Sequence, residues 1–322
     1  MADQELVLAR WGGGGEQSIV EVRGFESSGM LRLAPTDVGE GEVLLPVSEV
    51  GNLHFIFSDA YREAQLRESV GRPAEALYLL QQEIPAILPY AVLDQSNVPG
   101  AVRRYLRLLQ QMESWPEAVA IASMLTQDDH PHSLVGDLLN LIRDLIRVER
   151  IDDAAWVLGR IPLNQESSYC GSVERVAHEM RRAGYWREAG SVYARLSDVG
   201  AAWKSTPWAA LEAYCTWHLG DAEPATRLLQ ARPMDSGAKW AGLLGLLRGR
   251  VALRNGETAL ALDSLGEALI HAPADSEWRL EITAVIAESY RLHGQPALAQ
   301  RLQNELNHWY PESLWATSPA RH

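Results

Sequence analysis

A short step that begins with Gly or Glu and ends in Ala recurs seven times along the chain. It takes forms such as Gly-Arg-Pro-Ala-Glu-Ala, and its final residues are Ala76, Ala118, Ala154, Ala189, Ala225, Ala261 and Ala299. Successive alanines lie 42, 36, 35, 36, 36 and 38 residues apart. A near-constant interval of this length is typical of stacked supersecondary units that contact only their neighbours. The spacing therefore predicts a solenoid rather than a globule around one core.

The segments on both sides of each step have helical periodicity. From residue 58 onward, apolar residues recur at three- and four-residue spacings. Proline near the start of a second helix, as in Pro73, Pro116 and Pro296, suits a position whose N–H has no helical partner. These patterns predict about seven helix-turn-helix units. The segment 84–99 contains three prolines, so we expect it to interrupt the array and to pack on it, bridging toward the N-terminal residues.

The first 57 residues follow a different pattern, in which short runs are β-branched or alternate between apolar and polar residues. Gly, Pro, Ser and Asp separate the runs at 18–24, 29–35 and 42–47, and the segments 5–11 and 53–57 would supply two more strands. Five short strands predict a small barrel-like domain, because closing a sheet removes its exposed edges. The strand rhythm resembles that of SH3-like or Sm-like barrels.

Composition and charge limit the partners of this chain. The net charge is −13 and the isoelectric point is about 5.2, which argues against sequence-independent nucleic-acid binding through a basic surface. No run approaches the ~20 apolar residues that a transmembrane helix needs. Cys170 and Cys215 are too few for a disulfide framework or a zinc site. The N-terminus fits either a soluble cytoplasmic protein or a bacterial envelope protein in which Met1 replaces a removed leader.

The helical part resembles the tetratricopeptide repeat (TPR) family. In the last two units, the small residues and the closing proline of that family are matched by Gly249, Gly256, Ala261, Ala268 and Pro273, and by Tyr290, Gly294, Ala299 and Pro311. The resemblance covers residues 58–311 and implies antiparallel helix pairs in a right-handed solenoid, with first helices lining a concave face. It also implies a non-enzymatic protein–protein interaction scaffold. The predicted domains are 1–57 and 58–311, followed by a tail at 312–322.

The TPR resemblance also implies which residues line the concave face. Counting back from each turn alanine gives a set that we call the candidate groove: Arg103, Arg107, Arg143, Arg147, His178, Arg181, Arg182, Tyr214, Trp217, His218, Arg250, Arg254 and Arg291. An arginine-rich face predicts an acidic peptide or a C-terminal carboxylate as its ligand, because guanidinium groups form forked hydrogen bonds to carboxylates. Tyr214 and Trp217 would add a flat apolar anchor.

Structural explanations for these arginines stand beside the functional one. Five of them lie in the last turn of a first helix, where any cation stabilises the helix dipole: Arg147, Arg181, Arg182, Arg254 and Arg291. Four others lie further inside their helices: Arg103, Arg107, Arg143 and Arg250. The dipole does not account for this second group, whose alternative role is to pair with Glu or Asp of a neighbouring helix.

The sequence contains no nucleophile, base and stabilising group that can be argued together, and we expect no metal or cofactor. The alternative to a peptide-binding scaffold is a structural subunit of a larger envelope or secretion-type assembly, which uses its convex face and C-terminal helix. Trp309 and Trp315 would then either close the array or make a contact between copies. The two hypotheses differ in the oligomeric state that they predict.

Overall fold

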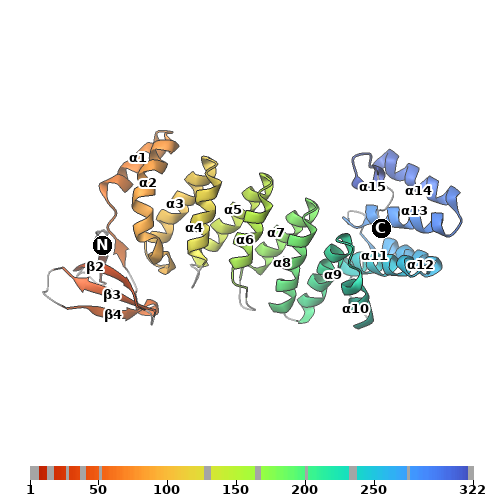
Figure 1. The fold of residues 1–322 in the computed structure, drawn as a ribbon, viewed down its shortest axis with the longest axis horizontal. Coiled ribbons are helices and arrows are strands. Elements are labelled where there is room, and N and C mark those ends of the chain that lie inside the picture. The colour runs from red at the N-terminus through yellow and green to blue at the C-terminus, as the bar shows by residue number, and fades with distance from the viewer. Residues whose placement is uncertain are drawn as a thin grey trace. The chain divides into compact units, whose positions relative to one another are not determined.

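The structure is a computed structural model of the 322-residue chain (Figure 1). It describes residues 7–12, 18–26, 29–36, 41–50, 53–126, 132–163, 168–199, 202–231, 238–273 and 276–317. The chain divides into two compact units, which are treated separately below. The first unit comprises residues 1–162 and 171–176, and the second comprises residues 163–170 and 177–322. The predicted domain boundary at residue 57 stays a prediction.

The first unit begins with a five-stranded antiparallel sheet in the order β4-β3-β2-β1-β5 (Figure 1). The strands are β1 (Leu8–Trp11), β2 (Ser18–Phe25), β3 (Met30–Pro35), β4 (Val43–Pro46) and β5 (His54–Phe55), with the 3-10 helix η1 (Val47–Glu49) before β5. Alternation places Val20, Val22, Leu31 and Leu33 in the core. The five predicted strands are therefore confirmed. Among the described strands no ladder joins β4 to β5, so closure into a barrel stays a prediction.

The proline-rich segment joins this sheet to the helices of the first unit. Helix α2 (Pro73–Ile87) continues through Pro85, and both Ile84 before the proline and Ile87 after it are buried. The 3-10 helix η2 (Leu88–Val92) comes next. The interruption thus begins at Leu88, four residues later than predicted. The Tyr90 ring lies 5.2 Å from the Phe55 ring. Asn97 at the start of α3 (Val98–Gln111) accepts from Phe55 N at 2.8 Å and donates to Phe55 O at 2.9 Å.

Seven helix pairs make up the rest of the described chain, which confirms the prediction of a TPR-like helical repeat. After α1 (Asp59–Ser69) with α2, and α3 with α4 (Trp115–Leu125), the pairs are α5 (Val135–Arg147) with α6 (Ile151–Arg160), α7 (Cys170–Arg182) with α8 (Trp186–Val199), α9 (Ala202–His218) with α10 (Glu223–Ala231), α11 (Ala238–Arg254) with α12 (Thr258–His271), and α13 (Arg279–Leu292) with α14 (Pro296–Trp309). Two short helices, η3 (His132–Leu134) and α15 (Leu314–Thr317), complete the order. Within the described ranges, no helix is both long and apolar enough to cross a membrane.

The recurring sequence step is the turn inside each helix pair. Its first residue has a positive φ in all seven pairs: Gly71, Glu113, Glu149, Gly184, Gly220, Gly256 and Gly294. In the first turn, Gly71 N donates to Glu68 O at 3.0 Å and Arg72 N donates to Arg67 O at 2.8 Å, and the other six turns repeat this pattern. These are Schellman caps, which favour glycine because it has no Cβ. The alanine that ends the step is at most 9% exposed in every pair, so it fits between the two helices.

Two glycines of α11 allow close contact with α12. A Cβ added to Gly245 would collide with Ala268, and a Cβ added to Gly249 would collide with Leu265. Ala268 and Leu265 are themselves buried, so neither has open space to move into. The close packing of α11 against α12 therefore requires glycine at positions 245 and 249. This agrees with the assignment of Gly249 and Ala268 to small positions of the repeat.

Candidate functional site

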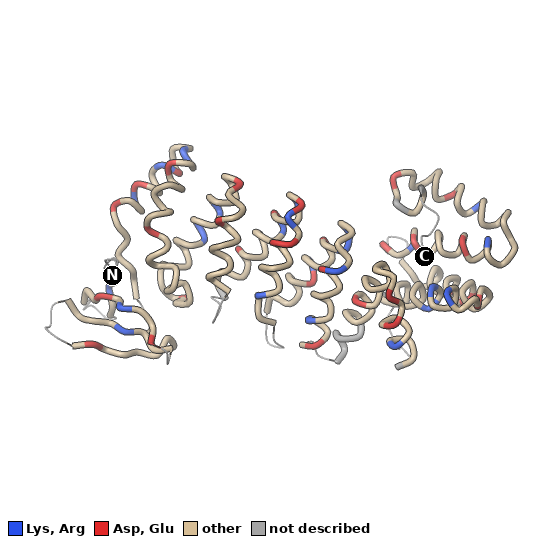
Figure 2. The backbone as a smooth tube through the Cα atoms, viewed as in Figure 1, with Lys and Arg blue, Asp and Glu red and all other residues tan. Residues whose placement is uncertain are grey.

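In the first unit, arginines of the candidate groove form ion pairs between neighbouring first helices. Arg103 Nε of α3 donates to Asp137 Oδ2 of α5 at 2.8 Å. On the other side of α3, Arg107 pairs with Glu68 of α1, and Arg104 Nε lies 3.3 Å from the second oxygen of the same carboxylate. Figure 2 shows positions of both signs following one another along these helices. Arg103 and Arg107 thus both pair with acidic residues of a neighbouring helix, which was the structural alternative for these two arginines.

The other two candidate-groove arginines of this unit have contacts on their own helix. Arg147 donates to Asp144 Oδ1 at 2.6 Å in the last turn of α5, where a cation also suits the helix dipole. Arg143 lies 3.5 Å from Asn140 Oδ1. The side chains of Arg103, Arg107 and Arg147 remain 47%, 61% and 75% exposed. Each guanidinium is therefore paired and still accessible from solvent.

In the second unit, four residues of the candidate groove gather around two carboxylates that the sequence analysis did not select. We call this set the inner cluster: Arg181 of α7, Tyr214 and His218 of α9, Arg250 of α11, and Glu277 and Glu281 at the start of α13. All six members belong to the second unit, and all but Glu277, which lies in the turn before α13, are in helices α7, α9, α11 and α13. Arg181, Tyr214, Arg250 and Glu281 are all buried.

Glu281 is the most enclosed carboxylate of the inner cluster, with 2% of its surface exposed. It pairs with Arg250, accepts a hydrogen bond from Tyr214 Oη at 2.5 Å, and lies 3.7 Å from His218 Nε2. Burial alone would raise the pKa of Glu281. The positive charge of Arg250, together with the contacts of His218 and Tyr214, outweighs burial and lowers this pKa. The carboxylate is therefore ionised at neutral pH and neutralises Arg250.

Arg181 forms the second ion pair of the inner cluster. Its side chain is 5% exposed, and it donates to Glu277 Oε2 at 2.6 Å. Its guanidinium also lies 4.6 Å from the ring centre of Trp278, a favourable cation–π distance. Arg182 Nε shares the same Glu277 oxygen at 3.4 Å. Burial raises the pKa of Glu277, but the charge and hydrogen bond of Arg181 outweigh it, so the net shift is downward.

Aromatic rings hold the inner cluster in place. His218 stacks on Trp186 of α8 with ring centres 4.1 Å apart and an angle of 11° between the planes. The Tyr214 ring meets the edge of His218 at 4.6 Å and that of Trp278 at 4.9 Å. Such edge-to-face pairs add to the energy of burial. Tyr214 is thus a structural residue with 2% exposure, which differs from its predicted role as an accessible anchor.

The remaining candidate-groove residues of the second unit lie beside the inner cluster or outside it. His178 Nδ1 is 2.7 Å from the hydroxyl of the buried Tyr193. Trp217 lies next to Arg250, with the guanidinium carbon 5.9 Å from its ring centre. Arg254 is exposed in the last turn of α11, and Arg291 pairs with Glu288 on its own helix.

Cys215 is a free cysteine that lies buried in α9. Burial, the largest cause, raises the pKa of Cys215 to about 12, so this thiol stays protonated at neutral pH. In the described ranges, no three His, Cys, Asp or Glu side chains gather in a way that would hold a metal ion.

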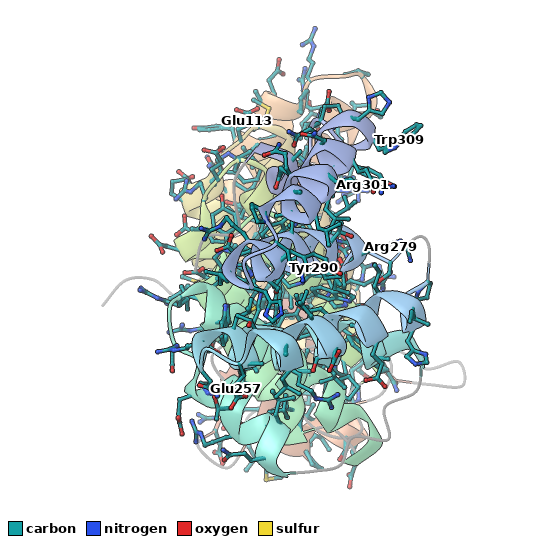
Figure 3. All side chains as sticks on the ribbon, turned by 90° about the vertical axis from the view of Figure 1, so that its right-hand side faces the viewer. Glu113, Glu257, Arg279, Tyr290, Arg301 and Trp309 are labelled. Atoms are coloured by element: carbon teal, nitrogen blue, oxygen red, sulfur yellow. The ribbon has the colours of Figure 1, made fainter. Side chains whose placement is uncertain are left out.

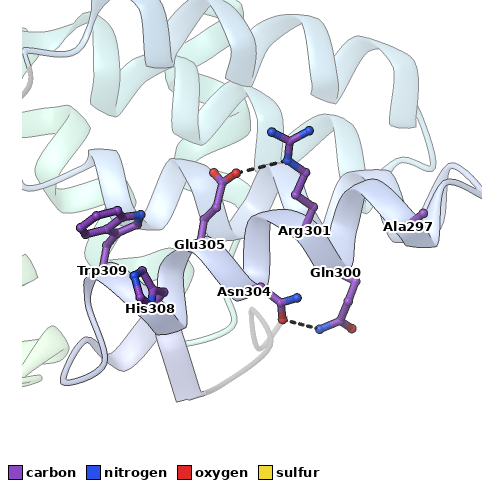
Figure 4. A pocket seen from close by; sticks show the side chains of 7 residues that line it. All are labelled: Ala297, Gln300, Arg301, Asn304, Glu305, His308 and Trp309. Atoms are coloured by element: carbon purple, nitrogen blue, oxygen red, sulfur yellow. Dashed lines mark hydrogen bonds and ion pairs between the residues drawn. The ribbon is translucent and has the colours of Figure 1, made fainter.

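The exposed face of α14 carries an open hollow of about 510 Å³ (Figure 4). Its lining residues are Ala297, Gln300, Arg301, Asn304, Glu305, His308 and Trp309. Two hydrogen bonds cross it, from Arg301 Nε to Glu305 at 3.3 Å and from Gln300 to Asn304 at 2.9 Å. Trp309 is 70% exposed at its edge, and Figure 3 shows its ring at the molecular surface.

The sequence analysis missed the acidic partners of its own arginines. Asp137 and Glu281 lie 17 and 18 residues before their turn alanines, distances that the count did not sample. Glu68 lies eight residues before Ala76, a sampled distance, but in a repeat from which no residue was selected. A search for carboxylates on neighbouring first helices would have selected Glu68 and Asp137, because each lies one repeat away from its partner.

No protein-family model matches this chain, and no curated protein matches it either. Several solved structures are similar to it. A tetratricopeptide repeat protein from Parabacteroides merdae is 10% identical, with a TM-score of 0.37, and the match covers 80% of this chain and 96% of that one. The TPR domain of P58(IPK) is 17% identical, with a TM-score of 0.25 and coverage of 80% and 75%. A putative kinesin light chain with TPR-like repeats from Podosopora anserina is 14% identical, with a TM-score of 0.23 and coverage of 78% and 92%.

Proposed function

We propose that this chain is a non-enzymatic protein–protein interaction scaffold, and that the first helices of its first unit bind an acidic peptide or a C-terminal carboxylate. The observation that carries this proposal is the accessibility of paired arginines on α3 and α5. Arg103, Arg107 and Arg147 are each held by an ion pair, yet 47% to 75% of each side chain is exposed. An exposed ion pair contributes only about 0–1 kcal/mol, so a ligand carboxylate can replace the internal one at little cost.

The inner cluster of the second unit is a poorer site for a carboxylate. Arg181 and Arg250 are each 5% exposed and already neutralised by Glu277 and Glu281. Removing one partner of such a buried pair costs about 3–5 kcal/mol, which an exchanging ligand would have to supply. The acidic ligand is therefore assigned to the first unit, and this is narrower than the groove predicted from the sequence.

A pull-down that compares two matched double variants tests this proposal. Arg103→Gln/Arg107→Gln removes two groove charges, and Arg72→Gln/Arg227→Gln removes two exposed charges elsewhere, at the start of α2 and on α10. Both variants change the net charge equally and keep a polar side chain. The bait is incubated with lysate at low and moderate salt, and bound proteins are identified by mass spectrometry.

We expect a specific partner to bind the native chain and the control variant, and to be lost from the groove variant. Moderate salt should weaken the same interaction, because exposed charges are screened within about 8–10 Å. A partner that binds all three proteins equally at both salt concentrations contradicts an arginine-dependent site. Such a result would indicate that the partner binds another surface of this protein.

The alternative function, a structural subunit of a larger assembly, is favoured by one observation on α14. Trp309 is 70% exposed and the adjoining Tyr310 is 49% exposed, beside the hollow described above. Exposed aromatic residues of this kind are enriched at protein interfaces. Trp315, the other residue assigned to self-association, is half-buried and lies toward the inner cluster. Sedimentation of the same samples separates the hypotheses, since a subunit should self-associate and a peptide-binding scaffold should remain monomeric.

A further inference from the structure

The short helix α15 folds back against α13 and α14 of its own unit. Gln303 of α14 donates to Ala316 O at 2.8 Å and lies 3.4 Å from Trp315 O. Ser313 Oγ accepts from Trp315 N at 3.2 Å, and Ala316 is 6% exposed. These contacts hold the backbone of α15 against α14.

The indole of Trp315 lies beside the inner cluster. Its ring centre is 6.0 Å from the guanidinium carbon of Arg250 and 6.3 Å from the centre of the His218 ring. The guanidinium carbon of Arg250 also lies 5.9 Å from the ring centre of Trp217. Arg250 thus has two indoles at a distance where cation–π attraction operates, one from α9 and one from α15. Trp217 belongs to a long helix, whereas Trp315 belongs to a helix of four residues.

The guanidinium of Arg250 also has one N–H group that donates no hydrogen bond within the described ranges. Its Nε is buried and has no hydrogen-bond partner within the described ranges, and the same holds for Nε of Arg181. Both side chains are about 5% exposed, so each unused N–H is an energetic cost that a suitably placed acceptor would relieve. A peptide carries such acceptors in its backbone carbonyls. The cluster is therefore equipped for both a ring and a backbone oxygen.

We propose that the inner cluster, with Trp217, forms a subsite for an aromatic side chain of a partner peptide, and that Trp315 fills this subsite in the free chain. This inference rests on the proposed function as a peptide-binding scaffold, and it assigns a second determinant to the ligand. The partner would present Trp, or another aromatic residue, to Arg250 and would displace α15 on binding.

The way in which α15 is attached makes it a displaceable occupant. It is joined to α14 through residues 310–313, so its local concentration near the cluster is about 1 mM, as for other short tethers. A segment that binds with an intrinsic Kd of about 0.1 mM would then occupy the subsite about ten times more often than it leaves it empty. A partner would meet a filled site, with its apparent affinity lowered about tenfold.

A peptide supplied in trans tests this inference. The probe is the fluorescently labelled peptide Tyr-Pro-Glu-Ser-Leu-Trp-Ala-Thr, which corresponds to residues 310–317. It is titrated by anisotropy against the full chain, against Trp315→Ala, and against Trp309→Ala. Trp309→Ala is the matched control, because it removes an exposed indole from the end of α14 without touching the inner cluster. Circular dichroism checks that both variants are folded.

We expect Trp315→Ala to bind the peptide about tenfold more tightly than either the full chain or Trp309→Ala. A peptide with Leu in place of its Trp should not bind, since Leu offers no ring to Arg250. Equal binding by all three proteins would overturn the inference. So would an absence of binding to Trp315→Ala at about 1 mM peptide, because a segment that weak could not stay in place through its tether.

This result is independent of the test of the proposed function. The pull-down depends on Arg103 and Arg107 of the first unit, and the anisotropy experiment depends on Trp315 of the second. Loss of partner in the arginine variant, together with no difference at Trp315, would retain the scaffold and reject the aromatic subsite. The reverse pair of results would retain the subsite and reject the arginine-dependent site.

Discussion

Replacing Glu113 and Glu149 with glycine should stabilise the first unit. These residues have φ values of 55° and 60° at the turn position where the other five helix pairs have glycine. A residue with a Cβ pays about 1–2 kcal/mol for this left-handed conformation. Glycine avoids that cost but loses about 0.5–1 kcal/mol through the greater freedom of the unfolded chain. The net gain is about 0.5–1 kcal/mol for each substitution, and both side chains are exposed, so no buried contact is lost.

The two substitutions should add, because they lie in different helix pairs, 36 residues apart in the sequence. Glu113→Gly/Glu149→Gly should therefore gain about 1–2 kcal/mol in the free energy of unfolding. For a unit of this size, that corresponds to a rise of about 2–8 °C in the melting temperature of its transition. Urea and thermal unfolding, each followed by circular dichroism, measure the two quantities.

A pair of Gly→Ala substitutions in α12 and the turn before it provides the control. Gly256→Ala places a Cβ at a φ of 79° and should destabilise the second unit by about 1 kcal/mol. Gly266→Ala lies inside α12, where an added Cβ meets open space, and should stabilise by up to about 1 kcal/mol. Loss of stability in either Glu→Gly variant, or shifts of the same sign in both controls, would refute the explanation based on backbone conformation.

Two further substitutions address the interior of the second unit. Glu281→Gln removes the charge that neutralises Arg250 and should lower the free energy of unfolding by about 3 kcal/mol. The pKa of Glu281 is lowered on folding, so its carboxylate stabilises the folded state above its ordinary pKa of 4.5, and this stabilisation is lost as the pH falls below that value. Urea unfolding between pH 6 and about pH 3 should thus show a smaller acid loss in the variant, and parallel curves would contradict the assignment. Gly249→Val should cost about 1–3 kcal/mol by collision with Leu265, and native stability would mean that α11 and α12 can separate without loss.

The repeat architecture could be predicted because its determinants are local. The turn glycines respond to a backbone angle, and the turn alanines respond to the packing of two helices that adjoin in sequence. Both signals recur at a fixed interval, so seven weak matches reinforce one another. The end of α2 was harder to place, because the burial of Ile84 and Ile87 outweighs the usual effect of Pro85.

The candidate site was less predictable, because its partners are distant in sequence. Counting from the turn alanine selected Arg181 and Arg250, but Glu277 lies 96 residues from Arg181. No periodic signal marks such a carboxylate, and only the folding of the second unit brings Arg181 and Glu277 together. The same long-range pairing changed the interpretation of these arginines from an open basic face to a buried, neutralised network.

The ion pairs on α3 also limit how this array could lengthen by duplication. Arg107 has its carboxylate on the helix before it and Arg103 has its carboxylate on the helix after it. If recombination copied the pair α3–α4, Arg107 of the second copy would face Gln110 of the first in place of Glu68. The new junction would join two basic helices without a compensating acid. Each repeat of this region therefore carries charges that match its own two neighbours, and the order of the repeats cannot be changed without losing ion pairs.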